Sequence, residues 1–128
     1  MDNGQSRENV LRVKSYSFAL RIVKAYKYLI AEKKEFVLSK QLLRSGTSIG
    51  ANVAEANQGQ SRPDFISKLS IALKESVETE YWLNLLRDSE YLTPEQTQSL
   101  LDECRELIRI LTSSIKTAKR SKRDQLAD

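Results

Sequence analysis

The chain contains 128 residues, enough for one domain with a hydrophobic core and too few for two ordinary domains. Apolar residues make up 40% of the sequence and charged residues 30%, a balance typical of a folded chain. It has no histidine and one cysteine, Cys104, which excludes imidazole bases, serine–histidine triads, histidine-ligated zinc and thiolate metal clusters. We therefore expect a protein that is not an enzyme, has no catalytic residues and uses no metal or other cofactor.

The sequence also predicts the cellular compartment of the protein. No apolar run is long enough to span a bilayer, and residues 1–10 lack the basic and apolar regions of a signal peptide. The single cysteine fits a reducing compartment. These features predict a cytoplasmic protein with no membrane partner.

The first half of the chain predicts two long helices. Only two prolines and four glycines occur in the whole sequence, which argues against a sandwich or barrel. Over residues 8–34, Leu11, Phe18 and Ile22 fall on one helical stripe, and a second helical pattern covers 37–57, with Gly59 as its expected stop.

The second half predicts two more helices from their start signals. Ser61, followed by a proline and an aspartate, is a typical N-cap, and Thr93 with Gln96 forms a capping box around Pro94. Four helices with short connections predict an all-α antiparallel up-down four-helix bundle. We expect a flexible N-terminus at 1–7, the bundle at 8–118 and a basic flexible C-terminal tail at 119–128.

The first predicted helix is apolar on two sides, and this pattern concerns whether copies of the chain associate with one another. Tyr16, Leu20 and Val23 lie roughly opposite the stripe that contains Phe18 and Ile22, and one monomer buries only one such side well. We interpret the second side as an interface in a homo-oligomer. The alternative is a broad core stripe with scattered apolar residues on the surface.

The segment RSGTSIGANVAEAN at 44–57 is a poor helix by propensity, so a tertiary contact must offset that cost. Gly46 and Gly50 lie one turn apart and predict a close approach by a neighbouring helix. A phosphate-binding nest is the alternative reading. We expect a structural polar network here, in which Arg44 pairs with Glu80 because a half-buried carboxylate needs a partner. Its predicted members are Arg44, Ser48, Asn52, Glu55, Glu75 and Glu80. A metal held by Glu55, Glu75 and Glu80 is a weaker alternative.

Three segments, RSGTSIGANVAEAN, SRPDF at 61–65 and IALKESVETEYWLNLL at 71–86, resemble the signature of the four-helix-bundle family named for 23S rRNA intervening sequences, also called S23 ribosomal proteins. The resemblance covers roughly residues 12–118. It implies a small bacterial protein without catalytic activity that assembles into a ring-like homopentamer. A related branch forms the accessory subunit of diversity-generating retroelements, which binds nucleic acid and a reverse transcriptase. The sequence departs from the family motif at Ala56, where a glycine is usual.

The net charge of +4 is unevenly distributed. Basic side chains concentrate in the first helix and in the C-terminal tail, where they predict contacts with the phosphates of structured RNA or DNA, with Tyr28 stacking on a base. The predicted contact residues are Lys14, Arg21, Lys24, Tyr28, Lys116, Lys119, Arg120, Lys122 and Arg123. A solvated basic face explains the same residues without a ligand. The alternative function is a protein-interaction scaffold or an accessory subunit, for example of a reverse transcriptase or another acidic partner.

Overall fold

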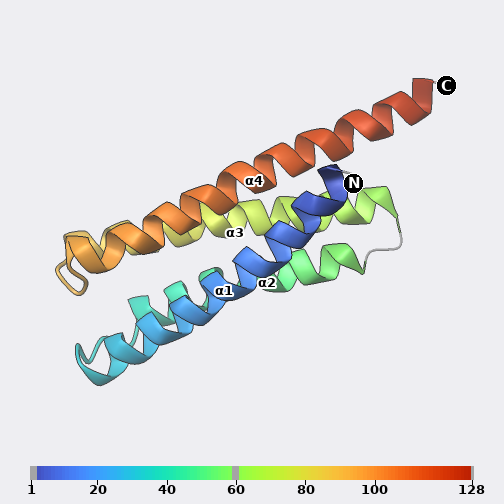
Figure 1. The fold of residues 1–128 in the computed structure, drawn as a ribbon. Coiled ribbons are helices and arrows are strands. Elements are labelled where there is room, and N and C mark those ends of the chain that lie inside the picture. The colour runs from blue at the N-terminus through green and yellow to red at the C-terminus, as the bar shows by residue number, and fades with distance from the viewer. Residues whose placement is uncertain (1–2, 59–60, 128) are drawn as a thin grey trace.

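The computed structural model describes residues 3–58 and 61–127 and the side chains of 10–58 and 61–121. Figure 1 shows four helices, α1 (Asn3–Ala31), α2 (Leu38–Asn57), α3 (Arg62–Asp88) and α4 (Pro94–Ala127). Each helix packs against the next one along the chain, and α4 closes the bundle against α1. The predicted all-α, antiparallel up-down four-helix bundle is therefore confirmed.

The core consists of one apolar stripe from each helix. Phe18 and Ile22 of α1, Ile49 of α2, Leu83 of α3 and Leu111 of α4 are all fully buried. Along each helix the buried residues recur mostly at spacings of three and four, so that they face the bundle axis. Burial of this apolar surface stabilises the fold, at roughly 25 cal/mol for each Å² removed from water.

The predicted start signals of α3 and α4 are confirmed. The Oγ of Ser61 accepts a hydrogen bond from the backbone N–H of Asp64 at 3.2 Å. At the start of α4, the backbone N–H of Gln96 donates to the Oγ1 of Thr93 at 3.1 Å, and the N–H of Thr93 donates to the Oε1 of Gln96 at 2.9 Å. Both caps use side chains to satisfy N–H groups that have no partner within the helix.

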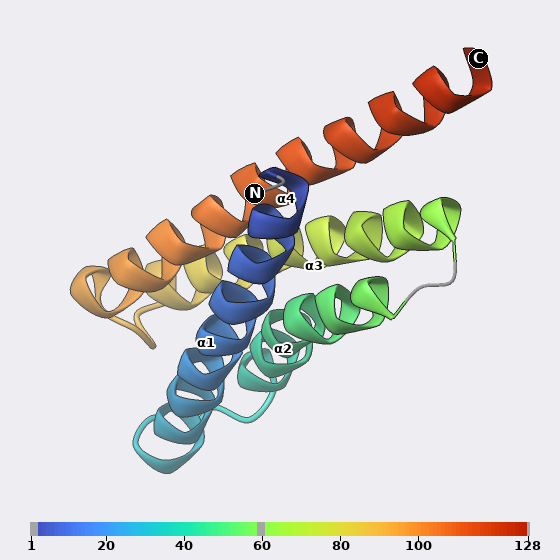
Figure 2. The ribbon, with the colours of Figure 1, turned by 45° about the vertical axis from the view of Figure 1, so that its right-hand side comes forward.

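Two helix ends differ from the sequence-based expectation. The helix α1 ends at Ala31 rather than at Lys34, which takes a left-handed φ of 53° in the turn that follows. The helix α4 continues through the segment predicted as a flexible tail and ends at Ala127, because residues 119–127 contain strong helix formers and neither glycine nor proline. Its last turns extend past the other helices (Figure 2). The predicted stop at Gly59 lies outside the described residues.

The contact between α1 and α2 explains why α2 contains poor helix formers. A Cβ atom on Gly46 would lie 2.8 Å from both γ-carbons of Ile22, and one on Gly50 would lie 3.2 Å from the backbone oxygen of Ser15. The missing side chains therefore let α1 lie directly on α2, as the sequence predicts. Within the described residues, none of the helices has a segment long and apolar enough to cross a lipid bilayer.

Candidate nucleic-acid interface

Three of the predicted contact residues line one groove between α1 and the beginning of α4. Arg21, Lys24 and Tyr28 follow one another at helical spacing along the flank of α1 that faces α4. The groove has a volume of about 290 Å³. Its other lining residues are Ala25, Leu92, Gln96 and Leu100. Two cations, a phenol and an amide therefore surround an apolar floor.

The guanidinium of Arg21 is held in place by α4. Its Nη1 donates to the Oγ of Ser99 at 3.0 Å and to the Oε2 of Glu103 at 2.5 Å. About two fifths of each of the Arg21 and Glu103 side chains remains exposed, so this ion pair is solvated. A guanidinium carries five N–H donors, and both of these bonds start from one of its nitrogens, which leaves donors for a further acceptor.

Lys14 lies outside this groove. Its Nζ forms an ion pair with the Oε1 of Glu106 at 3.0 Å. The pair borders a second, smaller depression of about 160 Å³, which Val13, Ser17 and Glu103 also line. Sequence analysis missed Glu103 and Glu106, although both lie at helical spacing on one flank of α4, as Lys14 and Arg21 do on α1.

The basic residues of α4 form a separate group. Lys116, Lys119 and Arg120 are exposed, whereas the side chains of Lys122 and Arg123 lie outside the described residues. At a rise of 1.5 Å per residue, about 28 Å of helix separates Lys119 from Leu100 in the groove. A single chain therefore presents two basic regions at opposite ends of the bundle rather than one continuous surface.

The predicted interface residues of α1 lie on the outer side of the bundle. Tyr16 is 67% exposed and Leu20 57%, and Val23 is half-buried. Val13, one turn before Tyr16, is 62% exposed. We call Val13, Tyr16 and Leu20 the α1 stripe. The second apolar side of α1 therefore faces away from its own core, which fits both the predicted interface and the alternative of scattered apolar residues on the surface.

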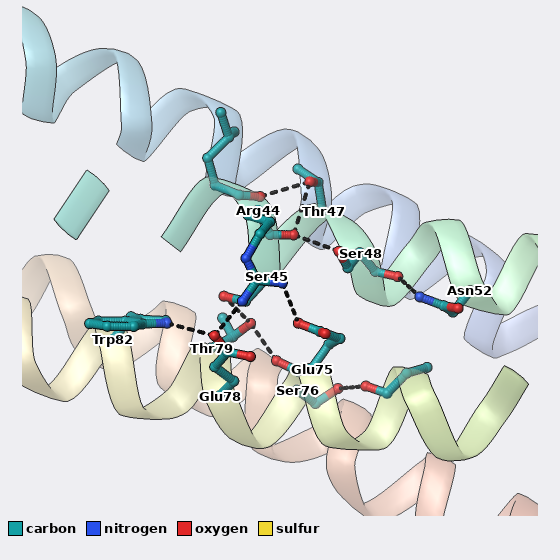
Figure 3. Close-up of polar contacts among 12 residues, drawn as sticks. Arg44, Ser45, Thr47, Ser48, Asn52, Glu75, Ser76, Glu78, Thr79 and Trp82 are labelled. Atoms are coloured by element: carbon teal, nitrogen blue, oxygen red, sulfur yellow. Dashed lines mark hydrogen bonds and ion pairs between the residues drawn. The ribbon is translucent and has the colours of Figure 1, made fainter. Parts of the chain in front are cut away.

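Of the six predicted members of the polar network, Arg44 and Glu75 meet at the contact of α2 with α3 (Figure 3). Arg44 forms an ion pair with Glu78 and another with Glu75 at 3.3 Å. The hydrogen bond that Arg44 donates to the Glu78 carboxylate is the main reason that the pKa of Arg44 is raised, and the same bond lowers the pKa of Glu78. Glu78 also accepts from the indole N–H of Trp82 at 3.2 Å.

The predicted Arg44–Glu80 ion pair is wrong. Glu80 lies on the opposite flank of α3, where its carboxylate accepts from the Nε of Arg105 on α4 at 2.6 Å. The carboxylate of Glu55 pairs with Lys68 at 2.7 Å. The three glutamates of the alternative metal site therefore have three different cationic partners, because Glu75 pairs with Arg44.

The other members of the network bond within their own helix or across the core. The side-chain amide of Asn52 donates to the backbone carbonyl oxygen of Ser48. The hydroxyl of Ser48 donates in turn to the backbone carbonyl oxygen of Arg44. Beneath them, the buried Thr79 hydroxyl lies 3.0 Å from the Oγ of Ser45 on α2. All of these residues lie within regular α-helices. A phosphate nest needs an irregular backbone, so the geometry of the segment does not support that alternative.

Cys104 belongs to the core. Burial raises the pKa of its thiol to about 12, and the Sγ donates to the backbone oxygen of Ser76 at 3.2 Å. A thiol of this kind is protonated at neutral pH and therefore a poor nucleophile.

Comparisons with known proteins agree with this architecture. The family model of the 23S rRNA-intervening sequence protein matches residues 7–113. This chain belongs to that family. A crystal structure of a protein of unknown function from the S23 ribosomal protein family of Bacteroides thetaiotaomicron VPI-5482 is 59% identical in sequence and superposes with a TM-score of 0.85. The alignment covers 86% of this chain and 98% of that protein. Among the curated proteins, none matches the chain.

Proposed function

We propose that this member of the 23S rRNA-intervening sequence family is a non-enzymatic, homo-oligomeric bundle of the cytoplasm that binds RNA. The observation that carries the proposal is the groove between α1 and α4, where Arg21, Lys24 and Tyr28 surround an apolar floor. Phosphate groups need cations, and unpaired bases need an aromatic or apolar surface on which to stack. The groove offers both within one site.

The size and make-up of the groove suit one unpaired nucleotide. Binding sites for larger organic ligands have volumes of about 300–1,000 Å³, so a groove of about 290 Å³ is at the lower limit of that range. In our proposal, a base packs against Tyr28 and the side chains of Leu92 and Leu100. Lys24 and the free donors of Arg21 contact the flanking phosphates, and Gln96 supplies an amide at the base edge.

Self-association strengthens such weak contacts. One chain carries a net charge of +4, which is modest for a nucleic-acid-binding protein. Several copies in one particle present several grooves and several basic α4 ends, and linked weak sites bind far more tightly than single ones. The exposed α1 stripe supports this part of the proposal, since an apolar row on a helix is typical of an interface.

A second candidate function is a protein-interaction scaffold or an accessory subunit, for example of a reverse transcriptase. The ion pairs of Lys14 with Glu106 and of Arg21 with Glu103 favour it, because cations that already have carboxylate partners attract phosphates less strongly. Under this function the charge serves solubility or a protein partner.

Binding to a fluorescent stem-loop RNA, measured by anisotropy against salt, separates the two functions. If each copy contacts about three phosphates, the affinity falls about 20- to 40-fold between 50 and 200 mM salt. We expect Lys24→Glu combined with Tyr28→Ala to weaken binding at least tenfold, and more for the stem-loop than for a perfect duplex.

The matched control is Arg62→Glu, which makes the same charge reversal at an exposed position at the start of α3, the opposite end of the bundle from the groove. This variant should bind within about threefold of the unmodified protein. Equal losses in the control and the groove variant would mean that net charge, and not the groove, determines binding. Absence of salt-dependent binding would refute the RNA-binding function and favour the scaffold.

A further inference from the structure

The side-chain amide of Gln96, which lines the groove between α1 and α4, is held in one orientation by the capping box of α4. Its Oε1 accepts from the backbone N–H of Thr93 at 2.9 Å, while the backbone N–H of Gln96 donates to the Oγ1 of Thr93. A backbone N–H only donates, so the oxygen of the amide has to be the end that faces it. The opposite end, Nε2 with its two N–H donors, is left for a ligand.

The other polar side chains that line the groove are also mainly donors. Lys24 has three N–H donors and no acceptor, and the guanidinium of Arg21 likewise only donates. The hydroxyl of Tyr28 both donates and accepts. None of the described residues that line the groove carries a carboxylate. The groove therefore suits a ligand that brings hydrogen-bond acceptors with it.

The purine bases differ in the acceptors that they offer on one edge. Guanine presents two neighbouring acceptors there, O6 and N7, whereas adenine presents the acceptor N7 beside the donor N6–H₂. A glutamine recognises adenine with both ends of its amide, since the oxygen accepts from N6 and the nitrogen donates to N7. In Gln96 the oxygen is already bonded to the cap, so this pairing with adenine is blocked.

We propose that the groove selects an unpaired guanine over adenine, with the Nε2 of Gln96 donating to O6 or N7 of the base. The inference rests on the RNA-binding function proposed above and names the base that the same site accepts. Lys24 and Arg21 keep their role at the flanking phosphates. With adenine in the same position, its N6 amino group would meet Nε2, and two donors would face each other without an acceptor.

The test uses hairpin RNAs that differ only in one bulged nucleotide, which is guanine, inosine or adenine. Fluorescence anisotropy at constant salt measures the affinity of each. We expect the guanine hairpin to bind about three- to tenfold more tightly than the adenine hairpin, which is the effect of one hydrogen bond gained. The inosine hairpin should bind like the guanine hairpin, because inosine keeps O6 and N7 and lacks only the N2 amino group.

The variant Gln96→Glu replaces the donor in the groove by an acceptor and keeps the cap, because glutamate takes the same position in a capping box. One carboxylate oxygen then accepts from Thr93, and the other is left for the ligand. We expect the preference to reverse, so that the adenine hairpin binds more tightly than the guanine hairpin. The matched control is Gln41→Glu, which adds the same charge at an exposed position on α2, outside the groove. It should keep the guanine preference of the unmodified protein.

The ratio of the two affinities separates the inference from the function on which it rests. A guanine preference that Gln96→Glu removes or reverses supports the inference, and thermal unfolding verifies that this variant keeps its fold. Equal affinities for guanine and adenine, or a guanine preference that persists in Gln96→Glu, would show that Gln96 does not recognise the base, while RNA binding stands. If none of the hairpins binds in a salt-dependent way, the proposed RNA-binding function fails as well.

Discussion

The two flanks of α1 differ in how closely they approach their neighbours. On the α2 side, two glycines remove the side chains that would separate the helices, and a Cβ on Gly50 would lie 3.2 Å from the backbone of Ser15. On the α4 side, long charged side chains bridge the helices, as in the pairs Lys14–Glu106 and Arg21–Glu103. Both grooves described above lie on this second side.

The difference separates the side of α1 that holds the helix in place from the side on which we propose that RNA binds. Contact with α2 fixes the position of α1, so the α4 side does not have to be tightly packed. Solvated ion pairs contribute little to stability, so Lys14 and Arg21 can exchange their carboxylate partners on α4 for other anions at little cost. A ligand site is therefore expected where the packing is loosest, beside a helix that its other neighbour holds in place.

The largest effect should come from breaking the close contact. Ile22→Ala removes a fully buried side chain and should reduce the free energy of unfolding by about 2–5 kcal/mol. Gly46→Ala introduces a methyl group that would lie 2.8 Å from the γ-carbons of Ile22 and should cost about 1–3 kcal/mol. In the double variant the methyl group occupies space that Ile22 vacates, so the combined cost should be smaller than the sum.

Urea unfolding followed by circular dichroism measures these free energies. The control on the open flank is Lys24→Ala, which should change stability by less than about 0.5 kcal/mol. Strictly additive costs of the two core substitutions would show that Gly46 and Ile22 do not limit the approach of the helices.

A smaller effect should come from Glu35, which lies in the turn that joins α1 to α2. Its buried carboxylate accepts from the backbone N–H of Ser39 at 2.7 Å and from that of Val37 at 3.2 Å. Burial acts to raise the pKa of Glu35, but the hydrogen bonds from the backbone of Ser39, Leu38 and Val37 outweigh it and lower the pKa below its ordinary value of 4.5. The folded state therefore favours the ionised carboxylate.

This sign sets the expected pH dependence. The stabilisation is fully present above the ordinary pKa of 4.5 and is lost as the pH falls through the lower pKa of the folded state. Glu35→Gln should cost about 1–2 kcal/mol at pH 7, and its difference from the unmodified protein should narrow as the pH falls towards 3. Urea midpoints between pH 7 and pH 3 provide the measurement. A difference that stays constant with pH would contradict a role for the charge.

The smallest effect on stability should come from the open flank. Glu103→Gln combined with Glu106→Gln removes two solvated ion pairs and should change the free energy of unfolding by less than about 0.5 kcal/mol. The same variant frees Arg21 and Lys14 and removes two negative charges, so RNA affinity should rise several-fold. Anisotropy at constant salt measures the affinity. Unchanged affinity together with unchanged stability would mean that these carboxylates do not compete with phosphate.

Local sequence signals predicted much of the fold. The caps at Ser61 and Thr93 involve residues three positions apart, so sequence alone specifies them. Helical periodicity likewise predicted which residues form the core and that Tyr16 and Leu20 face away from it.

Contacts between helices were harder to predict. Periodicity shows which side of a helix faces the core but not which neighbour lies on its left or right. Glu75 and Glu80 lie on opposite flanks of α3, and only the handedness of the bundle determines that Glu75 reaches Arg44 while Glu80 reaches Arg105. The partners of Lys14 and Arg21 on α4 depend on the same arrangement.

The acidic side chains of α4 also have a consequence for selectivity. Glu103 and Glu106 act as built-in counter-ions for Arg21 and Lys14, so a small, singly charged solute gains little by displacing them. A polyanion supplies many negative groups at once and can replace both carboxylates in a single binding event. If the protein binds RNA as proposed, we expect this arrangement to discriminate against single anions in favour of a chain of them.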